Sequence, residues 1–506
     1  MSKSQRSSSS AVVLAEAASL PVPVDGSARS AEMPAPTAPA GRIRRQSAIN
    51  MIGGLVSQGV KFLVVIYIAR SFPPQQFGWL SFAIAVNAFL FVVGHFGLPT
   101  YGARAVARAG AVHADVVLSI CAARGLLSFI ATGVTCVILH LMTSVSKEEL
   151  LLVAIFGLSN VPVAGLLDWA FQGIHRQDVS AIVNVVWQVF WFVFVVFGVR
   201  GGAGVLVVPV SLCFSALLAA VLAYLWLARN PGIEYGSAGS FNLYERSRKM
   251  LISGAALGIG TLLITVLVWT DTIVVRLLRG DEAAGLYAAG NRAALAMAML
   301  ANYFVQGAFP LLSRVAGDTP HFNACFQQCY DDLAFVFVPA SLWAIVYARE
   351  IIGVLFHRPE YATATIVFQI FQVILLATIL ENLYGIGVLV AHHRDADYQR
   401  SLMLTTALFI PLCVVSVRVA GIIGGAAAAF VAQAFCAALF VHKSKDVVVV
   451  DHRKALLIPA SLGLLVAAIG KGLDLTLFQS LPAVLLAYGA VAVTRLRNRN
   501  HHVGVC

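Results

Sequence analysis

The sequence predicts an all-α polytopic membrane protein with about 14 transmembrane helices, arranged as two pseudo-symmetric six-helix lobes plus a C-terminal helix pair. Composition is the first reason, because the 506 residues are 59% hydrophobic and only 12% charged, roughly half the charge of a soluble chain. Apolar runs of about 20 residues, long enough to cross a bilayer as a helix, recur almost from end to end. A repeated stretch then divides the chain into two related halves.

The repeat runs from Ala69 to Arg108 and again from Val275 to Arg314. Each copy has an arginine before a turn, a glycine at the start of the next apolar run, a proline at its end and another arginine. The matched residues are Arg70 with Arg276, Gly78 with Gly285, Pro99 with Pro310 and Arg104 with Arg314. A weak internal repeat of this kind is typical of transporters built from two related halves.

The individual helices are predicted from the apolar runs, with boundaries good to about three residues. In the first half they are expected at about 47–69, 78–98, 115–142, 149–172, 179–199 and 203–227. In the second half they are expected at about 250–276, 286–311, 333–356, 363–391, 400–418 and 421–441. A shorter pair, at about 455–470 and 475–494, closes the chain.

These helices divide the chain into six segments. The Ser-, Ala- and Pro-rich start has few large apolar side chains and is predicted to be disordered, and the longest polar break is predicted to join the halves. The segments are a disordered cytoplasmic tail (1–45), an N-terminal six-helix lobe (46–228), a cytoplasmic linker (229–249), a C-terminal six-helix lobe (250–445), helices 13–14 (446–494) and a basic cytoplasmic tail (495–506).

The distribution of charge predicts the orientation of these helices. The net charge is +11, and the Lys and Arg residues lie in short loops between apolar runs, so we expect no nucleic-acid partner. Most of them fall on the cytoplasmic side if both termini are cytoplasmic, as the positive-inside rule requires. The eight cysteines form no CxxC pair and no histidine or further thiol completes a site, so we predict no metal and no cofactor.

Cations within the apolar runs are the first candidate binding residues, because a charge at the centre of a membrane helix costs about 2.5–3.5 kcal/mol. Lys61 lies on a face of the first helix with Asn50 and Gly54, and Arg124 begins a face of the third helix that continues to Ser128. Arg292 lies early in the eighth helix. A lumen lined by Lys61, Arg124 and Arg292 would suit a diphosphate.

Each of these cations also has a structural interpretation. Lys61 could pair with a buried acid, Arg124 could extend to the membrane surface, and Arg292 could lie at the interface. The pattern favours the cavity for Lys61 and Arg124 and the interfacial position for Arg292, although Arg292 stays among the candidates for substrate binding.

Buried acids are the candidates for ion coupling. Glu381 falls within the tenth helix, Asp271 late in the seventh and Asp168 at the end of the fourth. A carboxylate within the membrane is by default a proton or sodium site or a counter-ion. Glu381 is the deepest and is our first choice for a titrating group that binds H+ or Na+, whereas Asp168 is expected to cap a helix or to pair near the cytoplasmic surface.

Several motifs resemble those of the Wzx-type polysaccharide flippases of the multidrug/oligosaccharidyl-lipid/polysaccharide (MOP) exporter superfamily. They are AR-x-FPP-x-x-FG from Ala69, FGLP-x-Y-x-x-R from Phe96, DWAFQG from Asp168, G-x-YAA-x-x-R from Gly285 and IIGVLF…EYATA from Ile351. The resemblance implies a carrier that moves an undecaprenyl-diphosphate-linked oligosaccharide to the outer leaflet of a bacterial inner membrane. It also implies membrane lipids as partners, and neighbouring polymerases and glycosyltransferases.

Other functions fit the sequence less well. A membrane enzyme such as a polysaccharide polymerase would need convergent catalytic groups in a sizeable outer loop, and the predicted outer loops are short, so we expect no enzyme. A carrier of drug-like cations would favour an acid in the first helix, where Lys61 lies. A carrier of the peptidoglycan precursor, lipid II, stays open as the main alternative, because it too handles a diphosphate lipid.

Overall fold

The computed structural model describes residues 40–480, apart from 143–144, 230–232, 235–242, 451, 474–475 and 478. The chain divides into two units, Met1–Gln46 and Ser47–Cys506, and the second contains the helical bundle. Most of the predicted tail 1–45, most of the predicted helix 475–494 and all of the tail 495–506 lie outside the described residues. The predicted segment boundaries stay predictions.

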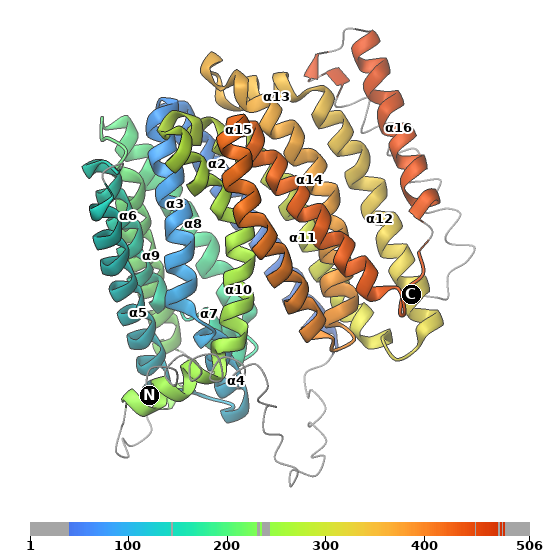
Figure 1. Ribbon diagram of the computed structural model, residues 1–506. Helices are drawn as coiled ribbons and strands as arrows, with labels where there is room; N and C mark the ends of the chain where they lie inside the picture. Colours follow the sequence, from blue (N-terminus) through green and yellow to red (C-terminus); the bar gives the residue numbers. More distant parts are fainter. Residues whose placement is uncertain are drawn as a thin grey trace, which may run out of the picture. The chain divides into compact units, whose positions relative to one another are not determined.

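The described elements are helices, apart from two very short strands that pair in parallel (Figure 1). The elements of the first half are α2 (Ala40–Ser71), α3 (Pro74–His95), α4 (Leu98–Ala109), β1 (Val112–His113), α5 (Ala114–Leu141), α6 (Lys147–Val163), η1 (Ala164–Leu166), α7 (Asp168–Gly173), α8 (Gln177–Arg200), α9 (Val207–Arg229) and β2 (Ile233–Glu234). Those of the second half are α10 (Leu243–Arg279), α11 (Asp281–Val315), α12 (Thr319–Val346), α13 (Ala348–Phe356), η2 (Pro359–Thr363), α14 (Ala364–Tyr384), η3 (Gly385–Val390), α15 (Asp395–Ser444) and α16 (His452–Gly472).

Eleven helices in the described part of the chain are long and apolar enough to cross a membrane. The predicted class, an all-α polytopic membrane protein, is confirmed, and the predicted total of 14 helices is not. One of the eleven, α15, is bent at Gly421, whose backbone is left-handed (φ 59°). The rings of Tyr398 and Phe440, near its two ends, stack with their centres 5.1 Å apart, so its two legs run antiparallel. These legs match the predicted eleventh and twelfth helices.

Several helices differ from the prediction, most clearly α4, α13 and α12. The short helices α4 and α13 lie where loops or the end of a span were expected, because their amphipathic turns are too short to give an apolar run of membrane length. The helix α12 begins at Thr319 rather than near residue 333, with the Asp318 side chain accepting a hydrogen bond from the backbone N–H of His321 at its start.

The two halves meet where α3 packs against α10 and α11. The helices α3 and α11 approach closely at Gly78 and Gly285, the residues matched in the sequence repeat. A Cβ atom on Gly78 would lie 1.8 Å from the carbonyl oxygen of Asp281, and one on Gly285 would lie 2.0 Å from that of Pro74. Both positions therefore need glycine, because any side chain would force the helices apart.

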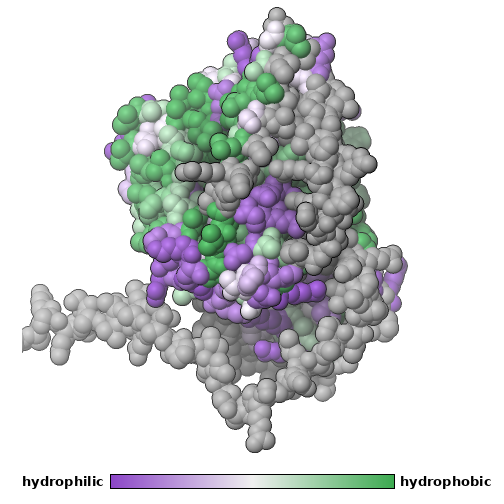
Figure 2. Space-filling view, turned by 90° about the vertical axis from the view of Figure 1, so that its right-hand side faces the viewer, coloured by the Kyte–Doolittle hydropathy of each residue, from purple (hydrophilic) through white to green (hydrophobic). Residues whose placement is uncertain are grey.

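Apolar side chains cover much of the outside of the bundle. Figure 2 shows them over a large part of the visible described surface, with hydrophilic residues gathered toward its lower end. Large exposed apolar residues occur on helices of both halves, for example Phe129, Phe197 and Val336. A surface of this composition suits acyl chains rather than water.

The contact between Gly78 and Gly285 leads to a stability prediction. Replacing Gly78 by Ala should lower the free energy of unfolding by about 1–3 kcal/mol, because the new methyl group must displace backbone atoms. The measurement is the melting temperature of the purified full-length protein in detergent. Gly59→Ala on α2 is the matched control, since nothing lies within 4 Å of a Cβ atom there. Equal melting temperatures for the two variants would contradict the tight crossing.

Candidate functional site

A cavity of about 640 Å³ lies between helices of both halves. Its walls come from α2, α3, α6, α8 and α9 in the first half and from α10 and α11 in the second. Aromatic side chains form much of the wall, and a few polar groups project among them. The aromatic residues are Phe62, Phe91, Phe156, Trp187, Trp191, Trp269 and Tyr303, and the charged ones are Lys61 and Arg292. Pockets of this composition are typical binding sites for organic ligands.

Lys61 lines the cavity from α2, as the polar face of that helix predicts. Gln58, one turn earlier on the same face, also lines it. Among the described residues Lys61 makes no hydrogen bond or ion pair, although Asp168 is close enough to attract it electrostatically. The ammonium group is therefore available to an anion in the cavity.

Arg292 also lines the cavity, so the interpretation that favoured an interfacial position for it was wrong. Its guanidinium carbon lies 4.0 Å from the ring centre of Trp269, which is also in the wall. One of its nitrogens, Nη2, is buried with no hydrogen-bond partner among the described residues. The stacking holds the guanidinium plane in place and leaves a donor unused. Its depth was misjudged because α11 begins at Asp281, so Arg292 lies three turns into the helix.

Arg124 lies outside this lining. It is buried within the first half, where Nη1 donates to the carbonyl oxygen of Ala164 at 3.2 Å and Nη2 bonds to Nε2 of His95. Arginine can only donate, so Nε2 of His95 accepts, and Nδ1 carries the hydrogen that is donated to the carbonyl oxygen of Phe91 at 2.9 Å. Arg124 thus fixes the end of α3 through His95, which lies one turn after the cavity residue Phe91.

Asp168 begins the short helix α7 and accepts hydrogen bonds from Ser180 and Asn184 of α8, both at 3.1 Å. Lys61 and Arg124 are both near enough to interact with it electrostatically. The structure therefore brings three of the predicted residues, Lys61, Arg124 and Asp168, into one charged cluster in the first half. In this cluster the carboxylate is tied to α8 and the ammonium group projects into the cavity.

Asp271 occupies a similar place in the second half. The hydroxyl of Tyr287 donates to it at 2.7 Å and the backbone N–H of Thr272 at 2.6 Å, and Arg292 attracts it electrostatically. Glu381 lies apart from the cavity, on α14 facing α15, where it interacts with Cys436 and leaves its Oε2 buried without a hydrogen-bond partner among the described residues. In each half a buried acid thus interacts with a cation of the cavity wall: Asp168 with Lys61, and Asp271 with Arg292. Glu381 is a separate buried carboxyl group.

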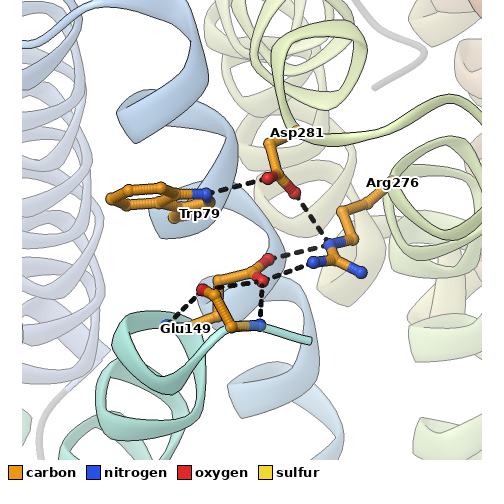
Figure 3. A network of polar contacts seen from close by, with 5 residues as sticks. Trp79, Glu149, Arg276 and Asp281 are labelled. Atoms are coloured by element: carbon orange, nitrogen blue, oxygen red, sulfur yellow. Dashed lines mark hydrogen bonds and ion pairs between the residues drawn. The ribbon is translucent and has the colours of Figure 1, made fainter. Parts of the chain in front are cut away.

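Sequence reasoning missed a set of polar contacts between the halves, which we call the seam network (Figure 3). It consists of Trp79 of α3, Glu149 of α6, Arg276 of α10 and Asp281 of α11. The guanidinium of Arg276 bonds Glu149 through two nitrogens, one of them at 2.8 Å, and lies 2.9 Å from an oxygen of Asp281. The indole N–H of Trp79 donates to the other oxygen of Asp281 at 2.9 Å.

One sequence family and several solved structures resemble this chain. The sequence profile described as "Polysaccharide biosynthesis protein" matches residues 43–316. A search among curated proteins finds no match. Among solved structures, the lipid II flippase MurJ in an inward closed conformation superposes with a TM-score of 0.71 at 13% identity, covering 89% of this chain and 99% of MurJ.

Further solved transporters share the fold more loosely. A MOP superfamily transporter from Pyrococcus furiosus gives a TM-score of 0.51 at 14% identity, covering 80% of this chain and 95% of its own. An inward-facing multidrug resistance MATE family transporter gives 0.52 at 11% identity, covering 79% and 94%. At such identities the likeness shows the fold alone, which is the fold of MOP superfamily transporters, as predicted.

The different surroundings of the two cations of the first half lead to a prediction. Arg124→Ala should destabilise the protein by about 1–3 kcal/mol, because it leaves His95 and the carbonyl of Ala164 without a hydrogen bond. Lys61→Ala breaks no hydrogen bond among the described residues and should melt close to the parent. Thermal unfolding of both purified variants measures the difference, and a Lys61→Ala variant that melts as low as Arg124→Ala would contradict it.

Proposed function

Because this chain belongs to the polysaccharide biosynthesis protein family, we propose that it is a flippase for an undecaprenyl-diphosphate-linked oligosaccharide. It would carry the repeat unit from the cytoplasmic to the outer leaflet of a bacterial inner membrane, for exopolysaccharide or O-antigen synthesis. Its place in membrane transport rests on the multi-pass architecture and the fold shared with MOP superfamily transporters.

The observation that carries the proposal is the pair of cations in the cavity wall. Lys61 comes from the first half and Arg292 from the second, and each has donor capacity that no described residue uses. A buried cation with unused hydrogen-bond donors is costly even with an acid nearby, so an anion in the cavity would be stabilised there. A diphosphate offers oxygens to both cations at once, and Arg and Lys pair strongly with phosphate when water is excluded.

The rest of the wall suits the sugars of such a substrate. Trp187, Trp191 and Trp269 offer flat apolar faces, while Asn87, Asn160 and Gln188 offer amide groups that can bond to hydroxyls. Of these amides, Gln188 has a buried oxygen without a partner among the described residues. Because the cavity is shared by both halves, rocking of one half against the other would present it to each leaflet in turn.

A second candidate is transport of lipid II. It is favoured by the superposition on MurJ, whose fold matches 89% of this chain. Lipid II carries the same anionic group, so Lys61 and Arg292 serve either substrate. The family match favours the polysaccharide intermediate, and a direct comparison of the two lipids separates the candidates.

The first functional prediction concerns the cavity cations. Lys61→Ala and Arg292→Ala should each lower the translocation rate of an undecaprenyl-diphosphate-linked oligosaccharide about tenfold or more, because a charged hydrogen bond contributes about 1.5–3 kcal/mol. The measurement is flipping in vesicles that contain the full chain, with lipid II assayed in parallel. The control is Lys147→Ala, an exposed lysine outside the cavity.

The outcomes of this experiment separate the possibilities. Movement of the oligosaccharide lipid alone supports the proposal, and movement of lipid II alone replaces it by the second candidate. If Lys61→Ala and Arg292→Ala both leave the translocation rate unchanged, the proposed anion site is wrong, whichever lipid is moved.

Coupling to an ion gradient is proposed for the buried acids, with Glu381 first and with Asp271 and Asp168 as the alternatives. If Glu381 binds H+ or Na+ during transport, Glu381→Gln should move substrate at the same rate with and without an imposed gradient, because the amide cannot change charge. Flipping is measured in vesicles under each gradient, with the exposed Glu360→Gln as control. Stimulation equal to that of the parent would exclude Glu381, and Asp271→Asn and Asp168→Asn then test the others.

A further inference from the structure

The seam network takes one residue from each of four helices, and on each helix that residue lies beyond the same end of the cavity. On α3, α6 and α11 the network residue precedes the residues that line the cavity, and on α10 it follows them. Arg276, for example, comes seven residues after the wall residue Trp269, about 10 Å further along α10. The four side chains therefore lie beyond the same end of the cavity.

The network joins the two halves of the chain directly. Glu149 is fully buried and is fixed to its own helix by a capping box, in which the backbone N–H of Ser146 donates to Glu149 at 2.9 Å and the Ser146 hydroxyl accepts from the N–H of Glu149 at 3.2 Å. Arg276 comes from the other half and packs over the ring of Phe82, 5.1 Å from its centre. Separation of the halves at this end has to pull Arg276 away from Glu149.

The charges in this network are not balanced. Two carboxylates, Glu149 and Asp281, share one guanidinium. The single hydrogen on Nε of Arg276 points to Glu149, so Asp281 is held by charge at 2.9 Å and by the indole of Trp79. Buried pairs of this kind recover hydration when they separate, which offsets much of the attraction that is lost. Such a contact can hold the two halves together and still separate at a moderate cost in free energy.

We propose that the seam network is a latch that holds this end of the cavity shut and must break when the carrier changes its side of access. In the predicted orientation this end faces the outside. The inference rests on the proposed transport function for its purpose, whereas the state of the latch can be measured without any substrate.

The test places a thiol in the cavity wall and asks whether it can be reached. In the full-length protein, Ala88→Cys on α3 adds a small side chain that lines the cavity. A membrane-impermeant maleimide is applied to sealed vesicles, to one face at a time. The chain without the added thiol gives the background from the native cysteines. With the latch intact, labelling from the closed side should be slow.

Breaking the latch should speed that labelling. Glu149→Gln should raise the rate about tenfold, because it leaves Arg276 without its main partner and shifts the balance between the two states. Trp79→Phe keeps an aromatic side chain but loses the five-membered ring with its N–H donor, so we expect a rise of about twofold to threefold. Glu148→Gln alters the neighbouring exposed acid and should leave the rate unchanged.

The possible outcomes decide the proposal. If folded Glu149→Gln and Trp79→Phe both label at the parent rate from either face, there is no latch. If Glu149→Gln fails to fold, judged by membrane content and melting temperature, Trp79→Phe decides alone. Faster labelling of the variants, in a protein that moves neither lipid, would support the latch and overturn the proposed function. Normal flipping of the oligosaccharide lipid with unchanged labelling would support the proposed function and overturn the latch.

Discussion

The cost of holding a charge out of water governs the arrangement of this protein. Charged side chains inside the bundle are held by polar partners or face the cavity. Arg124 bonds to a histidine and a carbonyl, Asp168 to two side chains of α8, and Arg276 to Glu149. Lys61 has no such bond among the described residues, and it lies where an anionic ligand can reach it. The polar groups therefore mark both the cavity and the seam network beyond its end.

Much of the fold can be predicted from the pattern of apolar residues and repeats along the sequence. Runs of apolar residues locate the long helices, and the repeat picks out Gly78 and Gly285, which contact each other where α3 crosses α11. The short helix α4 was missed because a partly apolar stretch of such length does not differ from a polar loop in hydropathy. The residues of α13 were predicted as the end of the span 333–356 rather than as a separate helix. The early start of α12 did leave a signal, since Phe322, Cys325, Phe326 and Cys329 are buried at helical spacing.

The site was harder to predict because a sequence gives the depth of a charge but not its neighbours. Lys61 stood out as a charge deep in an apolar run, and the structure places it in the cavity wall. Arg292 was assigned too near the surface. The repeat picked out Arg276, but its pairing with Glu149 was not predicted, because charges at the ends of apolar runs are usually anchors at the membrane surface. Their pairing depends on how α6 and α10 meet, which no local pattern specifies.

The unused charge in the cavity wall has a kinetic consequence for a carrier that rocks between two states. Closing both ends around a vacant chamber would strand the ammonium of Lys61 away from bulk water, at a cost of several kcal/mol. A bound diphosphate would lower that cost by adding a counter-charge to that of Asp168. If this chain moves the proposed diphosphate lipid, the loaded carrier would therefore cross the barrier faster than the vacant one, and Lys61 would suppress idle cycling.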